Sequence, residues 1–313
     1  MAQTADGYLW IGTEDGLARF DGVKFVIFRK HNTPQLQSNQ ISALLVDRAG
    51  DLWIGTHGGG LAKLSRGKFF AYTTATGLSS DTIVTLYQDQ KGRLWVGTDG
   101  GGISVLDHGK FFQFSTRDGL ASDTVFSIAG DRLGRIWVGT HSGLSVFDGK
   151  KFSNYIFPGE PLKDVRIIYT DRSDHVWIGT GGRGLFSIGA EGVLHYSTAE
   201  GLSSNAIRSL LEDEKGTLWV GTESGGLNRF RRGLFSRYMS QEGLTGNDVW
   251  TLFEDREGSL WVGTAGSGLN RLRDGRSRSF RRKKDYQETS FCRFSKTARA
   301  RFGRVRKGKA STG

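Results

Sequence analysis

Leu52-Trp53-Ile54-Gly55-Thr56 is one of seven copies of the same short stretch in this chain. The tetrapeptide Trp-(Ile/Val)-Gly-Thr starts at Trp10, Trp53, Trp95, Trp137, Trp177, Trp219 and Trp261. The intervals between these tryptophans are 43, 42, 42, 40, 42 and 42 residues. A period near 42 residues indicates a repeat architecture, in which each copy is one supersecondary unit that packs on its neighbours.

One whole repeat, from Ile41 to Asp81, contains four short stretches of strand-like sequence separated by Asp- and Gly-containing turns. The predicted strands are Ile41–Asp47, Leu52–Thr56, Leu61–Leu64 and Lys68–Thr73. Four antiparallel strands make one sheet that cannot bury both faces alone. The sequence therefore predicts an all-β fold, a seven-bladed β-propeller of four-stranded antiparallel blades over residues 1–273.

Residues that recur in every repeat are interpreted as structural. The tryptophans are expected to pack between blades, the Gly to fit a crowded strand end, and the Thr to bond to backbone. An acid in the first turn is expected to form an Asx-type bond, at Asp47, Asp89, Asp131, Asp171, Asp213 and Asp255. Loops between repeats end in Asn39, Asp81, Asp123, Asn205 and Asn247, for which backbone capping is favoured over ligand contact.

Both ends depart from the repeat. Residues 1–4 correspond to the last half of a first strand, so the first blade is predicted to be incomplete. Residues 274–313 hold 14 Lys or Arg against 3 Asp or Glu, and the remaining 273 residues hold 29 of each. The excess charge of +11 therefore lies in the tail, together with Cys292, the only cysteine. Without a second cysteine, the sequence predicts no disulfide framework.

The basic tail is expected to be disordered, and two origins remain open for it. Read in a shifted frame, codons for residues 284–291 permit Gly-Leu-Ser-x-Asn-x-Val, which restores the repeat in register. We hypothesise that the tail is a frameshifted eighth repeat; the alternative is a basic nucleic-acid-binding arm. The favoured hypothesis implies no nucleic-acid partner. Residues 289–296 stand where a first strand could pair with the incomplete first blade.

The stretch from Asp6 to Leu17, Asp-Gly-Tyr-Leu-Trp-Ile-Gly-Thr-Glu-Asp-Gly-Leu, and its copies resemble the two component regulator propeller repeat. That resemblance implies the periplasmic ligand-binding sensor region of a bacterial hybrid histidine kinase or diguanylate cyclase. The chain shows no kinase, cyclase, membrane span or secretory signal, so it is expected to be a receptor fragment. As encoded it would remain cytoplasmic, and it would meet a membrane only through missing parts of the receptor.

A ligand site is expected where the turns between second and third strands surround the mouth of the central channel. The informative residues there are those that differ between repeats: Glu14, His57, Asp99, His141, Arg183 and Glu223. They suit a small polar ligand such as an oligosaccharide or peptide; the alternative is free drift of solvent-facing turns. His141 and Arg183 receive more weight because they flank an unusual loop, Phe157-Pro158-Gly159-Glu160-Pro161.

Signatures of catalysis are weak, so no catalytic residue, metal site or cofactor is proposed. The six histidines lack metal-binding spacings, and no nucleophile elbow or phosphate-binding loop occurs. Two alternatives to a sensor remain: a lyase-like enzyme using Glu14, His57 and His141 as acid and base, and a protein-interaction scaffold. A second propeller or self-association is a further partner class.

Overall fold

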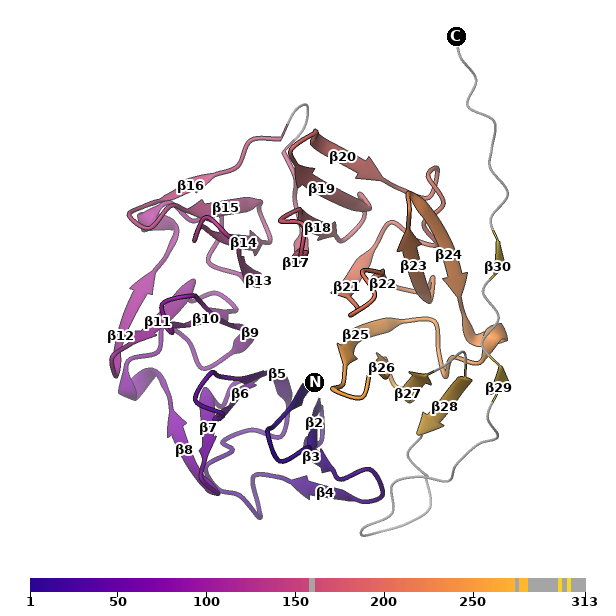
Figure 1. The fold of residues 1–313 in the computed structure, drawn as a ribbon. Helices are drawn as coiled ribbons and strands as arrows, with labels where there is room; N and C mark the ends of the chain where they lie inside the picture. Colours follow the sequence, from indigo (N-terminus) through magenta and orange to yellow (C-terminus); the bar gives the residue numbers. More distant parts are fainter. Residues whose placement is uncertain (158–160, 274–275, 281–297, 300–302, 305–313) are drawn as a thin grey trace.

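The computed structural model shows a ring of seven antiparallel sheets, numbered here as blades 1 to 7 along the chain (Figure 1). The structure describes residues 1–157, 161–273, 276–280, 298–299 and 303–304. In each blade the first strand lies nearest the central opening and the fourth lies on the circumference (Figure 1). The predicted fold class, a seven-bladed β-propeller, is confirmed.

The strands follow one order in all blades, each pairing with the next along the chain. Blades 1 to 3 contain β1 (Ala2–Gln3), β2 (Leu9–Thr13), β3 (Gly16–Phe20), β4 (Phe25–Phe28), β5 (Ile41–Val46), β6 (Leu52–Thr56), β7 (Leu61–Ser65), β8 (Lys68–Tyr72), β9 (Ile83–Gln88), β10 (Leu94–Thr98), β11 (Ile103–Asp107) and β12 (Lys110–Phe114). Blades 4 and 5 contain β13 (Val125–Gly130), β14 (Ile136–Thr140), β15 (Leu144–Phe147), β16 (Phe152–Asn154), β17 (Val165–Thr170), β18 (Val176–Thr180), β19 (Leu185–Gly189) and β20 (Gly192–Tyr196). Blades 6 and 7 contain β21 (Ile207–Glu212), β22 (Leu218–Thr222), β23 (Leu227–Arg231), β24 (Leu234–Tyr238), β25 (Val249–Glu254), β26 (Leu260–Thr264), β27 (Gly268–Arg273) and β28 (Arg276–Phe280).

Loops between blades share one construction. Three of them contain a single 3₁₀ turn: η1 (Thr74–Thr76), η2 (Thr116–Asp118) and η3 (Ser240–Glu242). Each turn ends at a glycine in the left-handed region, for example Gly77 at φ 113°. The terminal Asp or Asn then accepts a backbone N–H at the start of its own loop, as Asp81 Oδ1 does from Thr74 at 2.8 Å. Equivalent bonds to Asn39, Asp123, Asn205 and Asn247 confirm the capping prediction.

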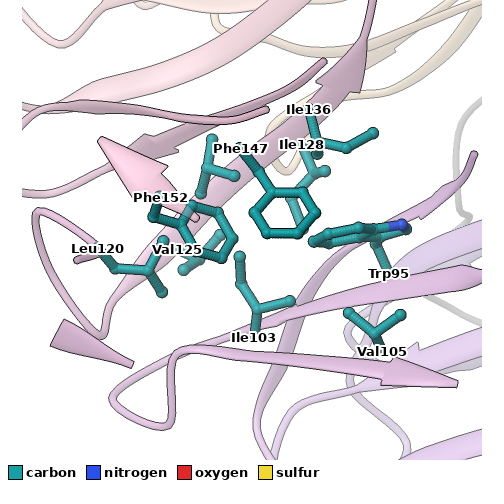
Figure 2. Close-up of a cluster of buried hydrophobic side chains, with 10 residues drawn as sticks. Trp95, Ile103, Val105, Leu120, Val125, Ile128, Ile136, Phe147 and Phe152 are labelled. Atoms are coloured by element: carbon teal, nitrogen blue, oxygen red, sulfur yellow. The ribbon is translucent and has the colours of Figure 1, made fainter. Parts of the chain in front are cut away.

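The hydrophobic core lies in the seams between blades. Figure 2 shows one seam, where Trp95 of blade 3 lies beside Phe147 of blade 4 with ring centroids 5.5 Å apart. Val125 and Ile128, both on β13, belong to the same cluster. In the described part of the chain each of the seven seams contains such a cluster and one repeat tryptophan. The prediction that the tryptophans pack between blades is confirmed.

The glycine of each Trp-x-Gly-Thr stretch allows the next blade to approach. A Cβ at Gly139 would lie 2.6 Å from the carbonyl oxygen of Val165, the first residue of the next inner strand. At Gly55 it would lie 2.6 Å from a methyl of Ile83. The following Thr bonds back to the backbone, as Thr56 Oγ1 does to the Gly60 carbonyl at 2.7 Å. Both predicted roles are confirmed.

The acid of the first turn joins that turn to the tryptophan. Asp47 accepts the backbone N–H groups of Ala49 and Asp51 with Oδ1 and the indole N–H of Trp53 with Oδ2, at 2.8 Å. The indole bond recurs at 2.7–2.9 Å in blades 3 to 7. In blade 1, Thr4 Oγ1 accepts the indole N–H of Trp10 at 2.9 Å. The Asx-type bond was predicted; the indole bond was not.

Blade 1 closes the ring against blade 7. Its inner strand β1 pairs only Ala2 with Trp10 and Gln3 with Leu9, which confirms the predicted incomplete first blade. Trp261 of blade 7 packs edge-on against Phe20 of blade 1 with ring centroids 6.0 Å apart. The Arg256 backbone N–H also donates to Gln3 Oε1 at 3.0 Å. Apolar contact and a hydrogen bond therefore join the first and last blades.

The predicted boundary at residue 273 is wrong, because β28 pairs with β27 and completes blade 7. Phe280 anchors this strand, with its ring 5.6 Å from that of Trp261. Blade 7 therefore extends to Phe280, into the segment that was predicted to be tail.

Of the rest of the tail, the structure describes two short strands. These are β29 (Ala298–Arg299), which pairs with β28, and β30 (Gly303–Arg304), which pairs with β24. Residues 289–296, the predicted partner of the first blade, lie outside the described residues. No helix in the described part of the chain has the length and apolar character needed to cross a membrane.

Gly139→Ala is expected to lower the free energy of unfolding by about 1–3 kcal/mol, because its Cβ would press on the backbone of the next blade. Gly182→Ala is the control, since nothing lies within 4 Å of that Cβ position. Urea unfolding followed by tryptophan fluorescence measures both variants. Equal stability of the two variants would contradict the close-approach role of Gly139.

Asp47→Ala is expected to cost about 1–3 kcal/mol in unfolding free energy, because the buried indole N–H of Trp53 loses its acceptor. Asp21→Ala removes a similar turn bond, from Val23 and Lys24 to Asp21 Oδ1, where no indole is involved. The Asp47 variant should unfold at a clearly lower urea concentration than the Asp21 variant. Coincident unfolding curves would show that the indole bond adds nothing.

Candidate functional site

In blades 2 to 7 the inner strand carries one irregular residue, close to the start of the strand. In blade 5 the pairing between β17 and β18 skips Arg166, and in blade 6 the pairing between β21 and β22 skips Arg208. In blade 7 the skipped residue is Trp250. Bulges of this kind redirect a side chain from the regular alternation of a strand. Because β17, β21 and β25 are neighbouring inner strands around the centre of the ring (Figure 1), these three residues come from corresponding positions in three successive blades.

Two of these residues are arginines that converge on one carboxylate. Arg166 Nη1 donates to Glu223 Oε2 at 2.8 Å, and Arg208 Nη2 lies 2.8 Å from the same oxygen. Arg166 also pairs with Asp164, whose Oδ2 accepts its Nε–H at 3.0 Å. The arginines are one-quarter to one-third exposed, and the Glu223 side chain is 41% exposed. We call Asp164, Arg166, Arg208, Glu223 and Trp250 the rim cluster.

Trp250 adds an aromatic surface to the rim cluster. The Arg208 guanidinium carbon lies 5.4 Å from the centroid of the Trp250 ring, within the range of cation–π attraction. Trp250 is 53% exposed, whereas the seven repeat tryptophans are buried. Since a large exposed indole provides apolar area and a polar N–H, it suits contact with a ligand.

The local backbone of blade 5 is adapted to this arrangement. Asp164 takes a left-handed conformation at φ 51°, which is unusual for a residue other than glycine. Its backbone N–H donates to the carbonyl oxygen of His141 at 2.8 Å. A Cβ at Gly181 would overlap the Asp164 carboxylate, so glycine at that turn leaves room for the acid that holds Arg166.

The charges in the cluster favour ionised Glu223. The hydrogen bond from Arg166 and the nearby charge of Arg208 hold the pKa of Glu223 below its usual range. The two arginines are formally balanced by Glu223 and Asp164. The cluster is therefore a neutral network of charged groups, rich in donors and acceptors, next to an aromatic ring.

Four of the six predicted site residues lie beside the start of the inner strand of their blade, held by a shared backbone bond. The residue after Gly-Thr donates its N–H to the residue that precedes the inner strand of the same blade. These bonds are His57 to Gln40, Asp99 to Thr82, His141 to Thr124 and Glu223 to Ala206, at 2.9–3.1 Å.

Of the six predicted residues, Glu223 alone enters the rim cluster as the structure describes it. Glu14 and His57 are exposed, and Asp99 Oδ1 accepts the Thr124 hydroxyl. The His141 ring lies edge-on to Phe126 with centroids 6.3 Å apart. Arg183 turns toward the unusual loop, with Nη1 3.4 Å from the Pro161 carbonyl and its guanidinium 6.0 Å from the Phe186 ring centroid. Ligand contact by these residues stays a prediction.

Sequence reasoning missed Arg166, Arg208 and Trp250, although two signals were present. The chain has eight tryptophans and only seven belong to the repeat, so Trp250 stands apart. In blades 2 to 7 the first residue of the inner strand is always Ile or Val, whereas the second residue varies strongly. In blades 2 to 7 that variable residue is Ser42, Val84, Phe126, Arg166, Arg208 or Trp250.

Fold and site together define a repeat β-propeller with a polar and aromatic channel rim. A model of the family described as "Two component regulator propeller" matches residues 35–58, 77–100, 119–142, 201–224 and 243–266. Each matched segment runs from within one blade-connecting loop through the Trp-x-Gly-Thr strand of the next blade. Five of the seven repeats of the chain therefore match this family's repeat. No curated protein matches it.

Several solved structures are similar to the chain. One is the extracellular domain assigned to a hybrid two component system of B. thetaiotaomicron, with 27% identity and a TM-score of 0.76. That match covers 86% of this chain and 38% of the other, so the chain spans well under half the length of that domain. Virginiamycin B lyase from Staphylococcus aureus matches at 15% identity and a TM-score of 0.61, covering 75% of this chain and 81% of the lyase. At that identity the likeness to the lyase shows the fold alone.

Arg166→Gln is expected to raise the pKa of Glu223 toward that of an ordinary glutamate, because the largest stabilisation of the ionised carboxylate is removed. The ion pairs of Glu223 stabilise the fold above the ordinary glutamate pKa and are lost as the pH falls through the lowered pKa. Carbon NMR titration of the Glu223 carboxyl measures this pKa. Arg29→Gln, which disrupts a separate ion pair with Asp15, is the control and should leave it unchanged.

Proposed function

We propose that this propeller is a ligand-binding sensor module of a bacterial signal-transduction receptor, without catalysis of its own. The two component regulator propeller repeats and the likeness to an extracellular domain of a hybrid two component system support the sensor role. Ligand binding would change the conformation or assembly of the receptor, and an output domain of a histidine kinase or diguanylate cyclase would respond. The parent receptor would present the module in the periplasm.

The observation that carries the ligand-binding part is the rim cluster. Sites for small polar ligands combine apolar or aromatic surface with a few fixed polar groups. Here Trp250 provides the aromatic surface, and two arginines held by ion pairs provide fixed donors. Three successive blades contribute, so the arrangement occurs in one sector of an otherwise repetitive ring. A small polar ligand such as an oligosaccharide or a peptide suits this chemistry.

A lyase-like activity has less support from the residues first considered for it. A general acid and base must both reach the same substrate atoms. No described hydrogen bond or ion pair joins Glu14, His57 and His141, which lie in three different blades. The rim cluster holds its acids in ion pairs with arginine, which favours the ionised, non-donating form of Glu223. The other alternative is a scaffold that binds only proteins. The following experiment distinguishes that scaffold from a ligand-binding sensor.

A panel of oligosaccharides and short peptides is expected to contain a compound that raises the melting temperature of the protein. A ligand at 100 times its Kd adds about 2.7 kcal/mol to the apparent stability. Trp250→Ala should abolish that rise. Phe112→Ala is the matched control, because Phe112 is an equally exposed aromatic (53%) on the outer strand β12.

Retention of the rise in the Trp250 variant would place the ligand elsewhere on the propeller. If no compound in the panel changes the melting temperature, the protein-interaction scaffold becomes the better interpretation. Turnover of a hit compound, followed by mass spectrometry, would instead favour an enzyme.

A further inference from the structure

The rim cluster has fixed and movable parts. Arg166 and Arg208 lie on inner strands, and each has a second support: Asp164 for Arg166 and the Trp250 ring for Arg208. Glu223 lies on a turn directly before Ser224, a residue in the left-handed conformation at φ 62°. Its described side-chain partners are the two arginines, and it is the most exposed member of these ion pairs.

Rotation of the Glu223 side chain into solvent would therefore cost little. Exposed ion pairs contribute about 0.2–1 kcal/mol each, because water solvates the separated charges well. The arginines would stay in place, and both guanidinium groups would point at the position that Glu223 Oε2 had left. Arg208 also has a buried Nε–H without a hydrogen-bond partner in the described residues. Guanidinium groups bind carboxylates strongly through parallel charge-assisted bonds.

The position of the Trp250 ring restricts the kind of ligand whose carboxylate could replace that of Glu223. Trp250 lies on the far side of Arg208 from Arg166, on the next blade, with the guanidinium 5.4 Å from its ring centroid. A ligand whose carboxylate replaced that of Glu223 would place its adjoining body near the exposed indole. A ring attached directly to the carboxylate would offer a face for this indole to contact.

We propose that the ligand of the rim cluster bears a carboxylate, and that Glu223 is a resident counter-ion which this carboxylate displaces from Arg166 and Arg208. The inference rests on the proposed function and specifies the ligand class of that site. Glu223 then sets the threshold of the sensor, since every ligand must compete with it. An acidic sugar such as a uronic acid belongs to this class.

Glucuronate and glucose form a matched pair of probes, because they differ in having a carboxylate or a hydroxymethyl group on the same ring. Binding is followed by proton–nitrogen NMR of the indole N–H of Trp250 and the Nε–H of Arg208. Glucuronate should shift both signals, and glucose should shift neither. Glu223→Gln should bind glucuronate about three- to tenfold more tightly, because the competing charge is removed. Arg208→Gln should bind it at least about tenfold more weakly.

Glu14→Gln is the control, since Glu14 has the corresponding position in blade 1 and lies outside the rim cluster. Glu223→Ala is a second variant that the turn should tolerate, because Ala265 has the same position in blade 7. Unchanged or weaker glucuronate binding in both Glu223 variants would overturn the inference. So would failure of glucuronate to shift either signal in any of these proteins. Binding of glucose equal to that of glucuronate, dependent on Trp250, would also overturn it but would leave the sensor function standing.

Discussion

In blades 2 to 7 the repeat tryptophan donates a hydrogen bond to the acid of its first turn, and the rest of the propeller depends on this interaction. It joins the turn between the first two strands to the indole that fills the seam with the next blade, so local structure and blade packing form together. In blade 2 a single carboxylate, that of Asp47, satisfies two backbone N–H groups and the Trp53 indole. A buried donor without an acceptor would cost about 1–3 kcal/mol, and the bond recurs around the ring.

In blades 2, 3, 4 and 7 a cation lies over the indole that makes this bond, and it comes from one of two positions. In blades 3 and 4 the residue two before the tryptophan supplies it: Arg93 and Arg135 pair with the turn acid and lie over the indole. In blades 2 and 7 that position is Asp51 or Ser259, and the cross-strand residue, Lys63 or Arg271, lies over the indole instead. The repeats differ in sequence at these positions while the environment of the indole is kept.

The second residue of the inner strand can vary between blades because it lies outside the hydrophobic clusters of the seams and outside the indole hydrogen bond. In the seams between consecutive blades, the first residue of the inner strand packs closely against the glycine of the preceding blade, as Ile83 does against Gly55. The second residue sits at a bulge, outside the regular pairing, so the seam does not select its side chain. A repeat scaffold can thus carry Arg166, Arg208 and Trp250 in one sector without loss of packing. Such freedom lets a symmetric fold hold a single site.

The sequence by itself determined the number of blades, the order of strands and the structural role of the repeated residues, because period and turn chemistry are local properties. It also directed attention to the turn that holds Glu223. Tertiary structure decided which variable residues meet: Arg166, Arg208 and Trp250 lie about one repeat apart in the chain and become neighbours only when three blades pack side by side. It also moved the end of blade 7 to Phe280, since β28 pairs with β27 and Phe280 packs against Phe20 of blade 1, a contact that exists only in the closed ring. Local sequence cannot express contacts that ring closure creates.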